Sequence, residues 1–291
     1  MPIRKALDEK VVSTVAYVFM ILLSIVMLYP LLNVLAVSLS DYTEYVGNPT
    51  MIVPSHFTFS AYQRVLSTNL ILRGYLNSLF VTVFGTAISI TLTVATAYPL
   101  SKNKVRGAKY FTFMIVFTML FHAGMIPTYL LIRSLGLIDS LWALILCQAM
   151  TPYNFFIMRA NMEHIPDSLE ESVKLDGGNA FTILTKIVIP LCIPAIVALI
   201  LFYAVAHWNR FFEAMLYINS RAKWTMALIL REIIAENPNL VGEAGELSGT
   251  FVYPKSLQNA TIIITILPIM LVYPLIQRYF ITGIMMGSIK E

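Results

Sequence analysis

Long apolar stretches alternate with short polar segments along the 291 residues of the chain. A helix of about 20 apolar residues is long enough to cross the hydrocarbon core of a bilayer. Six stretches are apolar and long enough to span: residues 11–37, 75–100, 108–132, 141–160, 188–218 and 259–281. The pattern therefore predicts an all-α integral membrane protein with six transmembrane helices, which form a single domain over residues 1–291.

Proline and glycine lie inside these stretches, at positions where they would break the helices of a soluble protein. In a membrane protein, neighbouring helices can satisfy the backbone groups that such residues leave free. We therefore expect kinked spans, with the kinks near Pro30, Gly85, Pro127, Pro152, Pro194, Pro268 and Pro274.

The composition supports a location in lipid. Hydrophobic residues make up 58% of the chain, charged residues only 12%, and the mean hydropathy is +0.74. The net charge of +4 does not indicate nucleic-acid binding, because the basic residues flank apolar stretches instead of forming one polar face. Cys147 and Cys192 lie in or at the ends of apolar stretches, and their spacing suggests neither a disulfide framework nor a metal site.

The distribution of Lys and Arg predicts the orientation. Connections retained in the cytoplasm carry more positive charge than those outside, and short loops weigh most. The excess lies on the side of the N-terminus and is densest in the short loop 101–109. We therefore expect both termini in the cytoplasm, a first span that is retained instead of cleaved, and two sizeable outer loops at 38–74 and 219–258. The second outer loop contains an amphipathic stretch, 223–236, which predicts a short interfacial, re-entrant or packing helix.

The inner connection over residues 167–190 has an unusual amount of local structure. Asp167 precedes a helix-forming run and Glu170 follows three positions later, an arrangement that predicts a capping box. Gly177 and Gly178 then predict a left-handed corner. A second helix is expected from Ala180 to Ile189, with its end at Pro190. Such a compact bracket indicates a docking element for another protein.

Four residues of this bracket are spaced as in the EAA loop of the permease subunits of bacterial ABC importers. They are Glu171, Gly177, Ile187 and Pro190, while Ser172, Val173 and Ile189 depart from the family pattern but keep its helical and apolar character. Shorter stretches in the same order support the resemblance, which is nearest to the MalG-type permeases of carbohydrate importers. They are residues 77–79, 97–101, 208–209 and 277–280, with Gly283 and Gly287.

The resemblance implies a type I ABC importer permease fold with a cytoplasmic EAA coupling helix, in a bacterial cytoplasmic (inner) membrane. No G-x-x-x-x-G-K-[ST] motif occurs in the sequence, so ATP and Mg would be bound by separate ATPase subunits and this chain would hold no cofactor. The implied partners are a second homologous permease, two ATPase subunits and an extracytoplasmic solute-binding protein. The tail from Phe280 resembles a family segment that reaches the ATPase. The implied ATPase-coupling residues are Glu170, Glu171, Lys174, Asp176, Gly177, Gly178, Ile187 and Pro190.

Polar side chains inside the predicted spans are candidates for the substrate pathway, because they are costly in lipid. An aromatic ring beside an amide, as at Trp208 and Asn209, suits the apolar face and the hydroxyls of a sugar. The alternative is structural: Arg210 and Glu213 form an ion pair within one helix and Trp208 belongs to an interfacial aromatic belt. The full set of pathway candidates is Trp208, Asn209, Phe212, Gln148, Asn154 and His122.

The resemblance leaves the substrate open. The tail 283–290 resembles importers of larger or acidic oligosaccharides, including alginate oligosaccharides, whereas a permease for an amino acid, a phosphate or a peptide is an alternative. A remote alternative from another class is an intramembrane enzyme that uses His122 or His207. It would need a nucleophile or a metal-ligand set beside one of them, and the sequence shows no such motif.

Overall fold

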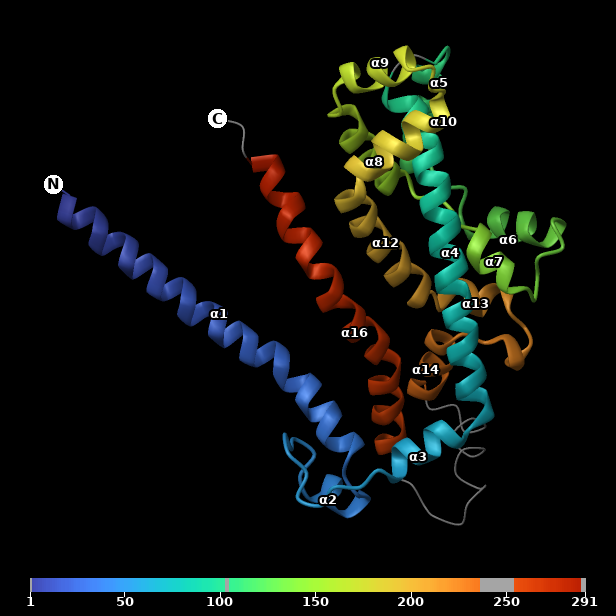
Figure 1. Cartoon of the computed structure of the whole chain (residues 1–291). Helices are drawn as coiled ribbons and strands as arrows, with labels where there is room; N and C mark the ends of the chain where they lie inside the picture. Colours follow the sequence, from blue (N-terminus) through green and yellow to red (C-terminus); the bar gives the residue numbers. More distant parts are fainter. Residues whose placement is uncertain (1, 103–104, 236–253, 289–291) are drawn as a thin grey trace. The chain divides into compact units, whose positions relative to one another are not determined.

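The computed structural model describes residues 2–102, 105–235 and 254–288, and all regular structure in these ranges is helical. The chain forms two units, which are described separately. The first comprises Met1–Asn69 and Glu232–Ile266, and the second comprises Leu70–Arg231 and Leu267–Glu291. Figure 1 labels the helices along the chain.

The first unit begins with α1 (Pro2–Ser38), a helix of 37 residues. Most of its side chains from Lys10 to Leu32 are exposed although they are apolar, as expected of a helix surface that faces lipid. Two short helices follow, α2 (Tyr42–Gly47) and α3 (Ser60–Ser67). The amide of Asn33 in α1 donates hydrogen bonds to the carbonyls of Pro49 (3.0 Å) and Met51 (2.9 Å), and these bonds fix the following loop against the end of α1.

The second unit contains the remaining helices, except for the last three residues of α14 and the first part of α16, which belong to the first unit. Its helices are α4 (Asn69–Ser101), α5 (Ala108–Leu120), α6 (Met125–Ser134), α7 (Leu141–Leu146), α8 (Pro152–Glu163), α9 (Asp167–Leu175), α10 (Ala180–Ile183), η1 (Leu184–Val188), α11 (Ile189–Leu191), α12 (Ile193–Trp208), α13 (Phe212–Tyr217), η2 (Arg221–Lys223) and α14 (Met226–Ile234), whereas α16 covers Pro254–Ser288. The helix α14 confirms the amphipathic helix expected within 223–236. Residues 236–253 of that outer loop and the last three residues of the tail lie outside the described part of the chain.

Three helices in the described residues are long and apolar enough to cross a membrane: Lys10–Ser38, Asn69–Ser101 and Lys255–Val272. Two further pairs qualify if each bent pair counts as one span. They are α5 with α6, bent by 118°, and Ala180–Leu191 with α12, bent by 80°. The structure thus provides three to five candidate spans, against the six that the sequence predicts.

The difference lies in residues 141–160. This stretch folds as α7, of 6 residues, and α8, of 12 residues, and neither is long enough to span alone. The break at 147–151 directly precedes Pro152, which occupies the first helical position of α8, where its missing N–H costs least.

Two buried clusters hold the second unit together. One joins the C-terminal half of α4 to α8 and to the segment 183–199, and its fully buried side chains include Phe155, Met158 and Met162. The other joins the N-terminal half of α4 to α7 and α13 through Val81, Leu144 and residues packed around them. Both clusters use α4, so this helix is the common support of the unit.

A close approach of α4 and α12 occurs at Gly85. A Cβ atom at this position would lie 2.7–2.8 Å from the ring atoms of His207, so only glycine allows the two helices this separation. Nearby, Ser89 Oγ lies 3.2 Å from His207 Nε2, and Thr93 Oγ1 lies 2.7 Å from the hydroxyl of Tyr203. Small residues and interhelical hydrogen bonds are the usual means of packing helices within a membrane.

Candidate coupling loop and translocation pathway

Residues 167–190, which we call the coupling loop, form the glycine corner that the sequence predicts. Gly177 has φ +78, in the left-handed region. Its N–H donates to the carbonyl of Lys174 (3.1 Å), and the N–H of Gly178 donates to that of Val173 (2.8 Å). These two bonds are the Schellman arrangement, which satisfies the last carbonyls of α9. The prediction for Gly177 is confirmed.

Gly178 is needed for a different reason. A Cβ atom there would lie 2.5 Å from Val173 Cγ1 and 2.9 Å from the Val173 carbonyl oxygen. Directly after the corner, the Asn179 side chain accepts hydrogen bonds from the backbone N–H (2.9 Å) and the hydroxyl (3.0 Å) of Thr182. The sequence analysis missed this N-cap, although an asparagine just before a helix is a common signal for one.

The predicted capping box is wrong. Pro166 occupies the N-cap position of α9, and the side chain there makes no capping hydrogen bond. The Asp167 carboxylate instead accepts a hydrogen bond from Lys102 Nζ (3.2 Å), and Glu170 Oε1 lies 3.2 Å from the same nitrogen. Both carboxylates thus contact a lysine distant in sequence.

The second half of the loop also differs from the prediction. The helix that begins at Ala180 does not end at Pro190 but continues through it to Leu191, with a π-helical turn at Leu184–Val188. Proline removes one hydrogen bond and crowds the carbonyl four residues earlier. A wider π turn just before it relieves that crowding. Ile187 is partly buried here and Pro190 is exposed.

The coupling loop presents both charged and apolar side chains on its surface. Glu171, Lys174 and Asp176 are exposed. Leu175 is 89% exposed and Phe181 is 72% exposed, on either side of the glycine corner. Large apolar side chains this exposed, on a loop that also carries charges, indicate a surface for another protein.

The pathway candidates fall into two groups. Gln148, in the break between α7 and α8, accepts a hydrogen bond from Arg210 (3.2 Å) and donates one to Glu213 (3.1 Å). Arg210, itself buried, also donates to the carbonyl of Leu144. The amide of Gln148 therefore links the two charged residues that the sequence analysis considered as a direct pair, and it ties the α7–α8 break to the α12–α13 break.

The other candidates are scattered. Trp208 is buried and meets Tyr75 edge to face, with ring centroids 5.5 Å apart, while Asn209 and Phe212 are exposed. Asn154 is buried in α8. His122 is exposed in the break between α5 and α6, close to the kink that the sequence predicts near Pro127. Apart from the Gln148 network, the structure does not gather these side chains into one constellation, and their role in the pathway remains a prediction.

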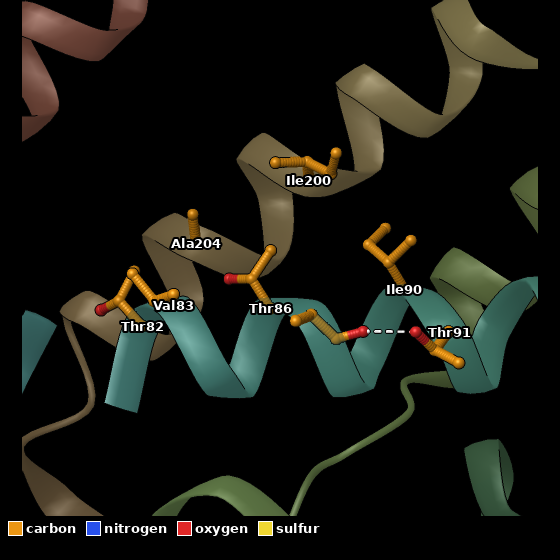
Figure 2. A pocket seen from close by; sticks show the side chains of 8 residues that line it. Thr82, Val83, Thr86, Ile90, Thr91, Ile200 and Ala204 are labelled. Carbon is orange, nitrogen blue, oxygen red and sulfur yellow. Dashed lines mark hydrogen bonds between the residues drawn. The ribbon is translucent and has the colours of Figure 1, made fainter. Parts of the chain in front are cut away.

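An open groove of about 500 Å³ lies between α4 and α12 (Figure 2). It is mostly apolar, and its lining includes the three threonines Thr82, Thr86 and Thr91 of α4 and Ile200 and Ala204 of α12. The hydroxyl of Thr91 is bonded to the carbonyl of Ala87 (2.8 Å), drawn as a dashed line in Figure 2. In the part of the chain that the structure describes, no three His, Cys, Asp or Glu side chains group as metal ligands.

A clamp on the predicted outer side was missed by the sequence analysis. Asp139 has φ +57, and its carboxylate accepts hydrogen bonds from the N–H groups of Asn219 (3.0 Å) and Ser220 (2.8 Å). It also accepts hydrogen bonds from the Ser220 hydroxyl (2.7 Å) and from Lys223 Nζ (2.8 Å). The hydrogen bond from Lys223, followed by those from Ser220, holds the pKa of Asp139 far below its usual range.

The N-terminal part of α4 fixes the same outer segment. The Asn77 amide donates to the carbonyls of Ala222 and Trp224, both at 3.0 Å. The Ser78 hydroxyl accepts the N–H of Met226 (2.8 Å), the first residue of α14. This gives a structural reason for the Asn77-Ser78 pair that the family resemblance singled out.

Similar proteins cover almost the whole chain. The polygalacturonan/rhamnogalacturonan transport system permease protein YtcP of Bacillus subtilis is 40% identical over 285 residues, which are 98% of this chain and 100% of that protein. Protein LplC of the same organism is 41% identical over 262 residues, 90% of this chain and 88% of its own.

Solved structures agree with this. A chain of a bacterial ABC transporter involved in the import of the acidic polysaccharide alginate has a TM-score of 0.87 and 34% identity, over 94% of this chain and 98% of that one. A chain of an alginate ABC transporter solved with an alginate pentasaccharide-bound periplasmic protein shares the fold alone, at 11% identity and a TM-score of 0.62 over 92% of this chain and 94% of that one.

A family model supplies the assignment. Residues 88–286 match the binding-protein-dependent transport system inner membrane component. This range contains the coupling loop, the Gln148 network and the Asp139 clamp. The chain therefore belongs to the family of binding-protein-dependent transport system inner membrane components, and it is a multi-pass permease subunit of an ABC transporter.

Proposed function

We propose that this permease forms half of the membrane pathway of an ABC importer for acidic oligosaccharides, and that the coupling loop receives the work of separate ATPase subunits. The observation that carries the proposal is the rigid corner at Gly177, with charged and apolar side chains exposed on either side of it. A protruding surface fixed by its own backbone hydrogen bonds can transmit a push from a partner, whereas a floppy connection would absorb it.

The proposed topology has six spans with both termini in the cytoplasm. In this arrangement α7 and α8 together form a broken fourth span, and broken helices are tolerated in membranes where protein buries the free backbone groups. In support of this, Ala143 and Leu144 of α7 and Phe155 and Met158 of α8 are buried, so each piece packs one side against protein. The coupling loop is then cytoplasmic and the Asp139 clamp lies outside.

Within the coupling loop we assign two roles. The exposed residues Glu171, Lys174 and Asp176 contact the ATPase, together with the apolar side chains beside them. Gly177, Gly178, Ile187 and Pro190 shape the bracket. ATP and Mg are bound by the ATPase subunits, and the complex also holds a second homologous permease and an extracytoplasmic solute-binding protein. The transported molecule passes near Gln148, Asn154, His122, Trp208, Asn209 and Phe212.

The substrate class follows from the relatives with the higher identities. The relatives at 40% and 34% identity are named for polygalacturonan/rhamnogalacturonan and for alginate, polysaccharides that share uronic acid residues with a carboxylate. Relatives for arabino- and galacto-oligosaccharides are only 23–26% identical. An anionic oligosaccharide is therefore the favoured cargo, and a non-sugar solute is the alternative that the experiment must exclude.

Transport in proteoliposomes tests the proposal. The complete complex, with its binding protein and ATP, is offered labelled trigalacturonate, and labelled maltotriose serves as a neutral control of the same length. We expect ATP-dependent uptake of trigalacturonate that exceeds that of maltotriose. Uptake of an amino acid, phosphate or peptide with no uptake of any uronate oligomer would contradict the substrate class, and failure to assemble with any ATPase would contradict the function itself.

A further inference from the structure

The side chain of Lys102 lies against the start of the coupling loop. Lys102 follows Ser101, the last residue of α4. Its Nζ donates hydrogen bonds to the carbonyl of Ile165 (2.9 Å) and to Asp167 Oδ1 (3.2 Å), and it lies 3.2 Å from Glu170 Oε1. The ammonium group thus makes hydrogen bonds to Ile165 and Asp167 and an ion pair with Glu170, all within the segment 165–170.

This ion pair is withdrawn from water. The side chain of Lys102 is 10% exposed and that of Glu170 is 3% exposed. Burying opposite charges is tolerated only where each is paired, and removal of one partner leaves a charge that cannot be solvated. The contact therefore holds the end of α4 to α9 and is not a chance pair of surface side chains.

The ion pair is formed on the buried side of α9. Glu170 is buried beside Lys102, whereas the next residue, Glu171, is exposed. Successive residues of an α-helix point in different directions around its axis, so the two adjacent carboxylates serve different neighbours. Glu170 faces Lys102 at the end of α4, whereas Glu171 can contact a partner protein.

The opposite end of α4 is also bonded to a distant segment. Asn77 and Ser78 hold residues 222–226 by three hydrogen bonds of 2.8–3.0 Å. The helix has 33 residues, which corresponds to a length of about 50 Å. One continuous helix thus joins the coupling loop to the predicted outer segment, as Figure 1 shows for α9, α4 and α14.

We propose that Lys102 is a positioning residue of the transport cycle. It makes α4 follow the coupling loop, so that a displacement of α9 by the ATPase reaches residues 222–226 through a rigid helix. This inference rests on the proposed function of the coupling loop. It adds a residue outside the loop, and a route by which the movement crosses the membrane.

The first test compares Lys102→Met with Lys102→Arg. Methionine keeps most of the apolar stem without the charge, and arginine keeps the charge and the donors. In proteoliposomes with trigalacturonate as the probe, we expect uptake per ATP hydrolysed to fall about tenfold for Lys102→Met, because a hydrogen-bonded charge pair contributes about that factor to an equilibrium. Lys102→Arg should stay within about twofold of the wild type. Lys109→Met, at an exposed lysine on α5, is the matched control and should be unchanged.

The second variant separates positioning from stability. Lys102→Met removes the ion-pair partner of the buried Glu170, so the protein can lose stability for that reason alone. The double variant Lys102→Met with Glu170→Met removes both charges, and we expect it to recover the melting temperature of the purified complex. If positioning is the role of Lys102, uptake per ATP stays low in this double variant. Recovery of uptake together with stability would overturn the proposal.

A substrate-independent measurement distinguishes this proposal from the proposed function. The chain has three tryptophans, so incorporation of 5-fluorotryptophan gives three ¹⁹F signals, and that of Trp224 in the outer segment is assigned with Trp224→Phe. Trapping the ATPase with ATP and vanadate should shift the Trp224 signal in the wild type and in Lys102→Arg, but not in Lys102→Met. A shift that persists in Lys102→Met, or that is absent from the wild type, overturns the route through α4. Absence of trigalacturonate uptake beside a normal shift contradicts only the substrate.

Discussion

At the scale of single residues, Gly177 has the clearest physical requirement. Its φ of +78 lies in the region that a side chain makes costly, and nothing lies within 4 Å of a Cβ atom built there. The cost of a replacement is therefore backbone strain and not a clash. A left-handed conformation costs an L-residue about 1–2 kcal/mol, and a β-branched residue tolerates it least.

We predict that Gly177→Val uncouples transport from ATP hydrolysis, because the corner opens and the coupling loop loses its shape. Uptake in proteoliposomes should fall while ATPase activity persists, and Gly177→Asn should be milder because asparagine enters the left-handed region more readily. Gly47→Val, at a glycine with ordinary φ and open surroundings, is the control. Wild-type uptake and ATPase activity in Gly177→Val would contradict the role of the corner.

Asp139 gives a prediction about pH. Its folded-state pKa is depressed, so the stability it contributes is fully present above its unfolded pKa of about 3.9 and is lost as the pH falls toward the folded value. We predict that Asp139→Asn lowers the melting temperature of the protein in detergent at pH 6, by an amount equivalent to about 1–3 kcal/mol, and that the difference shrinks below about pH 4. Asparagine also tolerates positive φ, so backbone strain does not confuse the comparison.

Asp41→Asn is the control for this experiment. Asp41 is exposed and makes no side-chain capping bond to α2. A difference between wild type and Asp139→Asn that is independent of pH from 3 to 7 would show that the carboxylate charge is not what holds the clamp.

The sequence predicts some of these residues and not others for a physical reason. The glycine corner depends on the conformation of one or two residues, so a local pattern reveals it. The partners of Glu170 and Asp139 lie 68 and 84 residues away, at Lys102 and Lys223, and no local pattern contains them. The capping-box prediction failed because it assumed that Asp167 and Glu170 act locally.

At the scale of helices, the contact between α4 and α12 depends on the absence of a side chain at Gly85. We predict that Gly85→Ala destabilises the protein, because the added methyl group overlaps the ring of His207. Melting in detergent should show the loss, and combining Gly85→Ala with His207→Ala should recover part of it by removing the obstructing ring. Additive losses in the double variant would show that this contact does not set the separation of the helices.

The lengths of the apolar stretches predicted where the helices lie, but they did not predict where the helices are interrupted. Stretch 141–160 is apolar enough to span, yet it divides at residues 147–151, and Gln148 in the gap bonds both Arg210 and Glu213. Arg210 lies between α12 and α13, and Glu213 lies in α13. The break therefore depends on tertiary contacts and not on the local sequence. By contrast, the break between α5 and α6 lies close to Pro127, one of the positions where the sequence predicted a kink.

At the scale of the whole molecule, the central claim is that the exposed coupling loop of this permease binds an ATPase subunit. Leu175 and Phe181 expose most of their apolar surface beside charged residues, and the proposed function gives them an ATPase subunit to bind. Burial of these two side chains against that partner would remove the exposure. The coupling loop must therefore be cytoplasmic and contact the ATPase.

Site-specific photo-cross-linking tests this claim most directly. A photoreactive phenylalanine analogue replaces Leu175, the most exposed large apolar residue of the coupling loop, in cells that express the complete complex. We predict a cross-link to the ATPase subunit, and none when the same analogue replaces Val53 of the predicted outer loop, which is 69% exposed. A Leu175 position that cross-links only to the extracytoplasmic binding protein, or that never cross-links to an ATPase, would contradict the account.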